Sequence, residues 1–229
     1  MFNIFKKKQT FGSVNFFQGF IDYHSHILPG VDDGVSKMGQ SLEILTEYEQ
    51  LGVTEVWCTP HIMEDIPNTT ADLRARFAEL QEAYKGSIKL HLAAEYMMDA
   101  VFEERLKSGD ILPLGLKQNK ILVETSYFNA PMHMNNTLQD IKAKGFTPVL
   151  AHPERYMYMD SEDYYKKLKQ NGIRFQLNVG SFSGAYGNTA KRKAEMLTKA
   201  EYYDYKGTDL HNIELLHHIL QTNLPECMK

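Results

Sequence analysis

The sequence predicts an α/β fold of parallel strands joined by helices, most simply a (β/α)7-type barrel. Seven short apolar or β-rich runs recur along the chain, and helical patterns separate most of them. Six of the seven runs carry a His, Asp or Glu at or just past their carboxyl end. An open sheet would gather such residues from only two or three strands at its switch point, so this distribution favours a barrel.

The seven runs are each bounded by turn residues. We expect strands within 19–26, 55–61, 88–96, 120–125, 147–152, 173–180 and 201–209. The first expected helix starts at a capping Ser36 and ends at Gly52. The same signals predict helices within 69–86, 99–109, 131–145, 161–172 and 188–200.

Composition narrows the class of protein. A chain of 229 residues with 43% hydrophobic residues is expected to be one globular domain, not a disordered or fibrous one. Its formal charge of −4 argues against a nucleic-acid surface. Two cysteines, Cys58 and Cys227, cannot form a disulfide framework, which favours the cytoplasm. No apolar run reaches the roughly 18–20 residues that span a bilayer, so we expect no stable membrane insertion.

The amino terminus combines lysines at 6–8 with several phenylalanines. A weak membrane-surface anchor is one interpretation, because aromatic and basic residues together suit an interface. The interpretation we favour is a frayed basic terminus whose later phenylalanines pack on the barrel.

The strongest local motif is the alternation Asp22, His24, His26 at the end of the first strand. A strand repeats every two residues, so these side chains share a face and the two imidazoles can chelate a metal. Asp33 follows in a turn that glycine flanks, with its neighbour Asp32 as the alternative.

Further polar residues end the later runs. They are His61, Glu95, Glu124, His152, Asp209 and His211. Taken singly, each has a structural alternative: a hydrogen-bonded histidine, or a glutamate paired with lysine. Taken together, imidazoles and carboxylates without a thiolate suit Mn²⁺, Fe²⁺ or Zn²⁺ in a hydrolytic site. Nine ligands are too many for one ion and fit two or three ions that share carboxylates, with a bridging hydroxide as nucleophile.

These motifs resemble the PHP (polymerase and histidinol phosphatase) superfamily, and within it the bacterial capsule-biosynthesis tyrosine phosphatases. The stretches IDYHSHILPGVDDG, TPH, AAEY, VLAHPERY and TDLHN occur in that family's order over about residues 20–215. The resemblance implies a distorted seven-stranded TIM-like barrel with up to three metal ions, most simply Mn²⁺, at the carboxyl face of its strands. It also implies one domain over 20–229, with residues 1–19 as an extension.

The resemblance also assigns roles. His24, His26, Glu95 and Asp209 would hold the first ion; Glu95, Glu124 and His152 the second; Asp33, His61 and His211 the third. Arg155 would contact phosphate. We expect Asp22 to orient a metal ligand, and Tyr156 and Tyr158 to line the mouth of the site. The chain has no arginine after Arg192, where relatives are expected to place a second phosphate contact. Lys191, Arg192 or Lys193 is the remaining candidate for that contact.

The expected function is hydrolysis of phosphotyrosine in a protein. The resemblance implies that this phosphotyrosine lies in the tail of a tyrosine kinase of polysaccharide export. A cysteine mechanism is excluded, because the position six residues after Cys58 is Glu64 and not arginine. The alternatives are a small-molecule phosphatase of the histidinol-phosphate type, a nuclease, or a binding module without turnover. An oligomer is compatible with the sequence.

Overall fold

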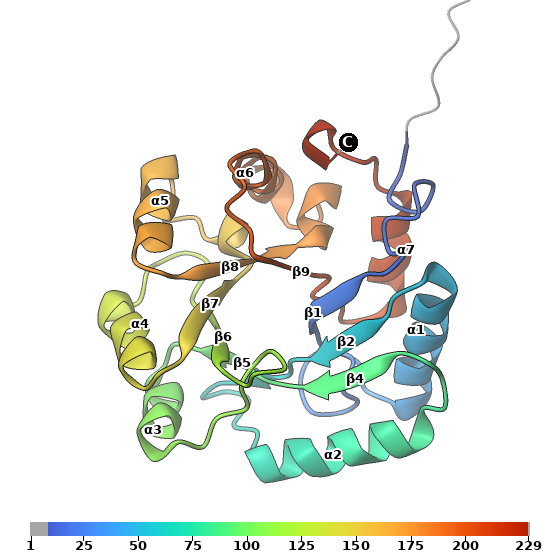
Figure 1. Ribbon diagram of the computed structural model, residues 1–229, viewed down its shortest axis with the longest axis horizontal. Helices are drawn as coiled ribbons and strands as arrows, with labels where there is room; N and C mark the ends of the chain where they lie inside the picture. The colour runs from blue at the N-terminus through green and yellow to red at the C-terminus, as the bar shows by residue number, and fades with distance from the viewer. Residues whose placement is uncertain (1–8, 229) are drawn as a thin grey trace, which may run out of the picture.

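The computed structural model describes residues 9–228 as an α/β fold in which every strand ladder is parallel (Figure 1). The strands are β1 (Ile21–Ser25), β2 (Glu55–Cys58), β3 (His61–Ile62), β4 (Lys89–Leu92), β5 (Glu95–Met97), β6 (Lys120–Glu124), β7 (Thr147–Ala151), β8 (Arg174–Asn178) and β9 (Tyr205–Gly207). The α-helices are α1 (Met38–Leu51), α2 (Thr70–Ala83), α3 (Ala100–Ser108), α4 (Met134–Ala143), α5 (Glu162–Gln170), α6 (Gly187–Lys199) and α7 (Ile213–Gln221). Short 3₁₀ helices are η1 (Pro153–Arg155), η2 (Val179–Ser183) and η3 (Glu226–Met228).

The strands form two curled parallel sheets. Their orders are β1-β2-β4 and β3-β5-β6-β7-β8-β9. The sheets meet where β1 lies beside β9: a parallel bridge joins Ser25 to Leu210, and the backbone N–H of His26 donates to the carbonyl of Leu210 at 3.0 Å. Figure 1 shows the strands curling around a common centre with the helices outside them. The expected parallel α/β architecture is confirmed.

Two of the seven expected strand runs are each broken into two strands. The run 55–61 becomes β2 and β3, interrupted at Thr59 and Pro60, because proline has no N–H to donate to a ladder. The run 88–96 becomes β4 and β5, and at the break the N–H of Ala94 donates to Leu112 and not to a strand. His61 and Glu95 therefore open short strands, where the sequence predicted strand ends, and they pair with each other in register.

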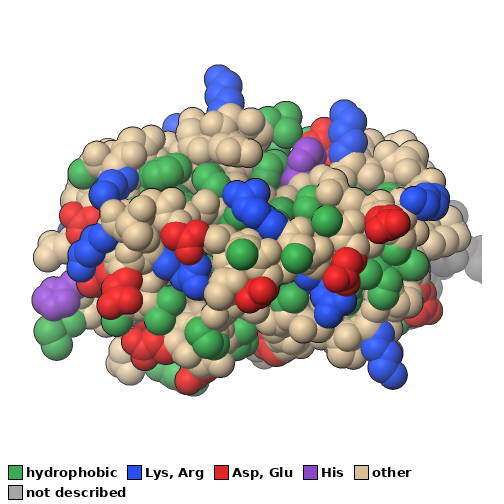
Figure 2. All heavy atoms as spheres, turned by 90° about the horizontal axis from the view of Figure 1, so that it is seen from below, with side chains coloured by type: hydrophobic (Ala, Val, Ile, Leu, Met, Phe, Trp, Pro, Cys, Tyr) green, Lys and Arg blue, Asp and Glu red, His purple; other side chains and the backbone are tan. Residues whose placement is uncertain are grey.

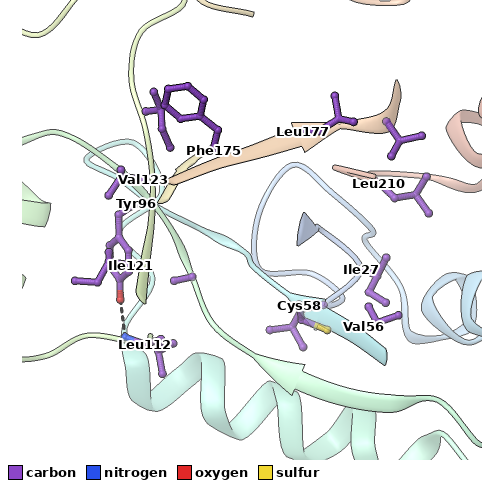
Figure 3. Close-up of a cluster of buried hydrophobic side chains, with 14 of the residues drawn as sticks. Ile27, Val56, Cys58, Tyr96, Leu112, Ile121, Val123, Phe175, Leu177 and Leu210 are labelled. Carbon is purple, nitrogen blue, oxygen red and sulfur yellow. Dashed lines mark hydrogen bonds between the residues drawn. The ribbon is translucent and has the colours of Figure 1, made fainter. Parts of the chain in front are cut away.

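Both faces of the central strands are buried, as parallel sheets covered by helices require. On β6, Ile121 and Val123 join the main core beneath the helices, whereas Leu122 joins a smaller cluster that contains Trp57. Figure 3 shows part of the main core, where the hydroxyl of Tyr96 accepts a hydrogen bond from the N–H of Leu112 at 2.8 Å. Cys58 is buried in this core, as expected of a small apolar side chain.

The two ends of the described part of the chain, near residues 11 and 222, pack against each other. Phe11 and Phe17 are fully buried, and the N–H of Phe11 donates to the carbonyl of Thr222 at 3.1 Å. The favoured interpretation of the later phenylalanines is therefore confirmed, whereas the lysines at 6–8 lie outside the described residues. Helix α7 was not predicted; its signal is Asn212, whose side chain accepts a hydrogen bond from the N–H of Leu215 as an N-cap.

The surface carries mixed charge. On the face seen in Figure 2, basic and acidic side chains are interspersed, in keeping with the small net charge of −4. None of the helices within residues 9–228 has the length and hydropathy needed to cross a membrane.

Candidate metal centre

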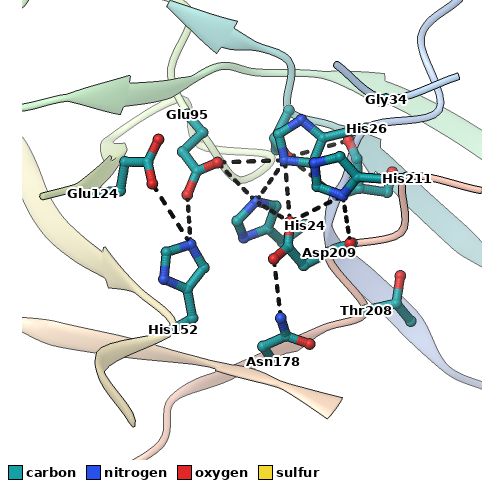
Figure 4. A network of polar contacts seen from close by, with 12 residues as sticks. His24, His26, Gly34, Glu95, Glu124, His152, Asn178, Thr208, Asp209 and His211 are labelled. Carbon is teal, nitrogen blue, oxygen red and sulfur yellow. Dashed lines mark hydrogen bonds and ion pairs between the residues drawn. The ribbon is translucent and has the colours of Figure 1, made fainter. Parts of the chain in front are cut away.

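The nine residues expected as ligands lie together at one end of the curled sheets. His24 lies within β1, Glu124 ends β6, and His61 and Glu95 open β3 and β5; the others follow β1, β7 or β9. Figure 4 shows seven of them turned toward one another: His24, His26, Glu95, Glu124, His152, Asp209 and His211. Their ligand atoms fall into three groups, each small enough to surround an ion.

The first group is fully inside the protein. It comprises His24, His26, Glu95 and Asp209, whose ligand atoms lie within 4.8 Å of one another. Nε2 of His24 is 3.1 Å from Nε2 of His26 and 3.1 Å from Oε2 of Glu95. Nε2 of His26 is 3.2 Å from Oδ1 of Asp209. Two imidazoles and two carboxylates around one point form a donor set for a divalent transition-metal ion.

The second group shares Glu95 with the first. It contains His61, Glu95 and Glu124, and His152 joins it because its Nε2 lies 3.0 Å from Oε1 of Glu95. Oε1 of Glu95 faces His152, whereas Oε2 faces His24 and also lies 3.3 Å from Nδ1 of His61. Glu95 therefore contacts both groups, as a bridging carboxylate would. Nδ1 of His61 and Oε1 of Glu124 lie 3.0 Å apart, yet neither has a hydrogen-bond partner among the described residues. Leaving buried polar atoms unpaired is costly, and a cation between them would satisfy both.

The third group lies nearest to solvent. It comprises His26, Asp33, His61 and His211. Oδ1 of Asp33 is 3.6 Å from Nε2 of His61 and 3.5 Å from Nε2 of His211, and the Asp33 side chain is 64% exposed. This group is the one through which solvent reaches the centre most directly.

Hydrogen bonds behind the rings decide which nitrogen faces the centre. Nδ1 of His24 lies 2.8 Å from Oε1 of Gln176, whose own Nε2 donates to the carbonyl of Leu177. An amide oxygen only accepts, so His24 donates from Nδ1 and presents Nε2 to the group. Nδ1 of His26 is held in the same way by Asp32, and Nδ1 of His211 by the backbone carbonyl of Asp209, both at 2.8 Å.

The locked rings point their ligand nitrogens at each other. The lone pairs of two neutral imidazoles 3.1 Å apart would repel, so a proton or a cation must lie between His24 and His26. Burial alone lowers the pKa of His24, but the charges of Glu95 and Asp209 raise it to about 9. In the metal-free protein the site therefore balances its carboxylates with protons, which a metal ion would displace. The donor set fits a divalent cation.

Two of the candidate ligands have a strained backbone. His152 has φ 32° and Asp209 has φ 52°, both in the left-handed region that residues other than glycine rarely adopt. Such positions cost about 1–3 kcal/mol each and persist where function requires them. Gly34 and Gly207 permit the close packing beside the ligands, because a Cβ at either position would lie 2.5 Å from the Cβ of His26 or His24, respectively.

Arg155 borders the first group from η1. Its Nη1 lies 2.6 Å from Oδ2 of Asp209, and its guanidinium lies between the rings of Tyr127, 4.5 Å away, and Tyr186, 4.1 Å away. The stacked rings fix the plane of the guanidinium and leave its edges for hydrogen bonds. Burial raises the pKa of Tyr186 to about 12, so this ring stays neutral beside the arginine at physiological pH.

Comparison with known proteins then places the chain. The family model "Capsular polysaccharide synthesis, CpsB/CapC" matches residues 20–224. The chain belongs to the CpsB/CapC family. The resemblance inferred from the sequence motifs is thereby confirmed at the level of the family.

This CpsB/CapC chain has characterised relatives. It is 28% identical over 199 residues to the tyrosine-protein phosphatase YwqE of Bacillus subtilis, covering 85% of this chain and 78% of that protein. It is 27% identical over 206 residues to the tyrosine-protein phosphatase CpsB of Streptococcus pneumoniae, covering 85% and 84%. A chain from the crystal structures of these two proteins, described as metal-dependent tyrosine phosphatases, matches with a TM-score of 0.78 and 25% identity over 88% of this chain and 85% of that chain.

Several supporting residues of the CpsB/CapC site were not predicted. Gln176 and Asn178 lie on β8, where Asn178 donates to Oδ2 of Asp209 at 2.9 Å. Their signal is two amides at alternate positions, interleaved with the apolar Phe175, Leu177 and Val179. Asp32 orients His26 and accepts a hydrogen bond from the N–H of His61, whereas the sequence offered it only as an alternative to Asp33. Tyr127 and Tyr186 had no comparable signal, because their role depends on where Arg155 lies.

Asp22 touches the site through the backbone. Its carboxylate accepts hydrogen bonds from the N–H of His24 and the N–H of Thr208, and from the hydroxyls of Tyr48 and Thr208. Within the described residues, no side chain of the nine candidate ligands forms a hydrogen bond with it. The geometry therefore supports a role in holding β1 against the segment that carries Asp209.

Two of the residues expected near the mouth of the site, Tyr156 and Lys193, make other contacts. Tyr156 is fully buried, and its hydroxyl accepts a hydrogen bond from the N–H of Thr125 at 3.3 Å. Lys193 donates to the carbonyl of Tyr156 at 2.6 Å. The aromatic residues beside Arg155 are instead Tyr127 and Tyr186.

Proposed function

We propose that this chain is a metal-dependent protein-tyrosine phosphatase that hydrolyses phosphotyrosine. The observation that carries the proposal is the cluster of converging imidazoles and carboxylates, with Arg155 at its border. Hydrogen bonds to Nδ1 of His24 and of His26 hold the Nε2 atoms of these two rings toward each other. Relatives of similar length are named as tyrosine-protein phosphatases, and the matching solved structures are described as metal-dependent.

We assign up to three divalent ions to the centre, with Mn²⁺ as the expected metal and Fe²⁺ or Zn²⁺ as alternatives. The first would be held by His24, His26, Glu95 and Asp209. The second would be held by Glu95, Glu124 and His152, and the third by Asp33, His61 and His211. Bound divalent ions supply Lewis-acid activation of water and neutralise the charge of a phosphate. Imidazole and carboxylate donors without thiolate support this choice of metal over a structural zinc site.

The chain's own residues supply binding and orientation. Arg155 presents charged N–H donors at a fixed angle to a phosphate oxygen, because Asp209 and two tyrosine rings hold its guanidinium. Gln176, Asp32 and the carbonyl of Asp209 keep the ligand histidines in one tautomer. The leaving phenol has a pKa of about 10, so its departure depends less on protonation by a general acid than that of an alkyl alcohol.

The finer architecture is part of the proposal. We assign residues 20–229 to one distorted (β/α)7 barrel of the PHP type, closed where β1 meets β9, with the metal centre at the carboxyl face of its strands. The bridge between Ser25 and Leu210 supports this closure. We assign residues 1–19 to an amino-terminal extension, of which Phe11 and Phe17 pack into the core.

The expected substrate is the phosphotyrosine-bearing tail of a bacterial tyrosine kinase that controls capsular or exopolysaccharide synthesis. The family description and the names of the relatives support this assignment. We place the reaction in the cytoplasm, because its reducing environment keeps free cysteines such as Cys58 and Cys227 as thiols.

A substrate panel tests the proposal. The protein is stripped with chelator, reloaded with Mn²⁺ and assayed on a phosphotyrosyl peptide, histidinol phosphate and single-stranded DNA. The proposal predicts that activity returns with Mn²⁺ and is highest on the phosphotyrosyl peptide. Activity that survives the chelator, or a preference for either of the other substrates, would contradict it.

A further inference from the structure

Large apolar side chains are exposed on two loops beside Arg155. Within the described residues, four large hydrophobic side chains are highly exposed: Leu116, Phe128, Met132 and Met157, at 76%, 68%, 91% and 60%. Three of these four lie on the segments that follow β6 and β7, at the end of the sheets that carries the metal centre. Leu116 precedes β6 and so lies toward the opposite end of that strand.

The two loops are joined to each other and to the site. The N–H of Met157 donates to the carbonyl of Tyr127 at 2.7 Å, which ties the segment after η1 to the loop that carries Phe128. The ring of Tyr127 covers the guanidinium of Arg155 at 4.5 Å and lies 5.8 Å from the ring of His152. Phe128 follows Tyr127 in the chain and Met157 lies two residues after Arg155, so both are on segments that lead directly to the group expected to bind phosphate.

The same loops lack charge. Residues 126–134 contain no Asp, Glu, Lys or Arg, and neither do residues 156–159, in a chain that is 24% charged. Exposing apolar surface without function is a liability, and such patches usually mark binding sites. A surface that contacts lipid headgroups normally adds lysine or arginine to its apolar residues, and these loops have none. Methionine side chains are flexible and adapt to a bound apolar group.

We propose that Phe128, Met132 and Met157 form a surface that binds an apolar side chain of the substrate protein close in sequence to its phosphotyrosine. This apolar loop surface rests on the proposed phosphatase function and specifies the class of peptide that the enzyme prefers. In this arrangement the phosphate binds beside Arg155. The residues next to the phosphotyrosine pass over Tyr127 and contact the apolar loop surface.

The test compares two phosphotyrosyl peptides of equal length and equal net charge. One has leucine on both sides of the phosphotyrosine and the other has serine. With the Mn²⁺-loaded wild-type protein, kcat/KM is expected to be about 10-fold higher for the leucine peptide, a difference of about 1.4 kcal/mol, because the leucine side chain is partly removed from water on the loops. In the double variant Phe128→Ser and Met157→Ser this ratio is expected to fall toward 1, and Leu116→Ser is the matched control that keeps it.

The outcomes separate this inference from the proposed function. Equal kcat/KM on both peptides, with turnover intact, would overturn the apolar loop surface and leave the phosphatase function standing. No turnover of either peptide or of p-nitrophenyl phosphate with Mn²⁺ would overturn the phosphatase function itself. Light scattering and vesicle sedimentation are run on the same variants. If the serine changes abolish self-association or vesicle binding and leave the peptide ratio unchanged, the surface serves another partner and the inference is wrong.

Discussion

Arg155 and Asp209 form an ion pair, with Nη1 2.6 Å from Oδ2, although 54 residues separate them in the chain. The other oxygen of Asp209, Oδ1, lies 3.2 Å from Nε2 of His26. One carboxylate therefore connects the first ligand group to the guanidinium. The metal centre and the group expected to bind phosphate are held in register by this contact.

Replacing Arg155 by lysine is expected to lower kcat/KM about 10- to 100-fold. Lysine keeps the charge but loses the planar fork that stacks between Tyr127 and Tyr186, and a hydrogen bond to a charged group is worth about 1.5–3 kcal/mol. Steady-state kinetics on p-nitrophenyl phosphate, together with elemental analysis, make the measurement. Metal content should stay unchanged, and Arg76→Lys on the exposed side of α2 is the control. Full activity in Arg155→Lys would show that the fork is not needed.

The neighbouring carboxylates Asp32 and Asp33 are expected to differ in their effect on metal binding. Asp32 is a buried partner of Nδ1 of His26, whereas Asp33 faces His61 and His211 from an exposed position. Asp33→Asn should lower the number of ions bound at saturation by one. Asp32→Asn should preserve that number and weaken binding about 10- to 100-fold, as loss of a partner behind a ligand does. Titration with Mn²⁺ followed by elemental analysis distinguishes them, and identical behaviour of the two variants would refute the assignment.

Gly207→Ala is expected to displace the metal ligand His24. The added Cβ would lie 2.5 Å from the Cβ of His24 and 2.8 Å from its backbone nitrogen, so His24 must move. Overpacking of this kind costs about 1–3 kcal/mol. Thermal unfolding with and without Mn²⁺ should show a lower Tm and a smaller shift on adding metal. Gly39→Ala within α1, where the new Cβ meets nothing within 4 Å, is the matched control and should be neutral or slightly stabilising.

The metal-free protein is expected to lose stability as the pH rises from about 6.5 to about 9. Burial lowers the pKa of His24, but Glu95 and Asp209 raise it to about 9 in the folded protein, above its unfolded value of 6.5. A raised folded-state pKa stabilises the fold below the unfolded pKa, and this contribution disappears as the pH passes the folded-state value. Melting of chelator-treated protein across this range makes the measurement. Asp209→Asn should flatten the profile, and a Tm that rises with pH in the wild type would argue against this interpretation.

The sequence predicted those site residues whose role follows directly from their position along a strand. His24, Glu124 and His152 could be found because each polar residue ends an apolar run, and parallel strands bring their carboxyl ends together. Asp32 and Asp33 could not be distinguished, because both occupy one turn and only the folded loop decides which carboxylate faces His26.

Other features depend on contacts between distant segments. Tyr127 and Tyr186 look like any other tyrosines until the fold places Arg155 between them. The breaks that make His61 and Glu95 open new strands follow from Pro60 and from a backbone contact between Ala94 and Leu112, and only the proline is visible in the sequence.

The central claim is that strand-end histidines and carboxylates hold a cluster of divalent ions. Crystals grown with Mn²⁺ and measured on both sides of the manganese absorption edge test it most directly. The account predicts two or three anomalous peaks: one bounded by His24, His26, Glu95 and Asp209, one by Glu95, Glu124 and His152, and one by Asp33, His61 and His211. A single peak, no peak, or peaks coordinated by other residues would contradict it.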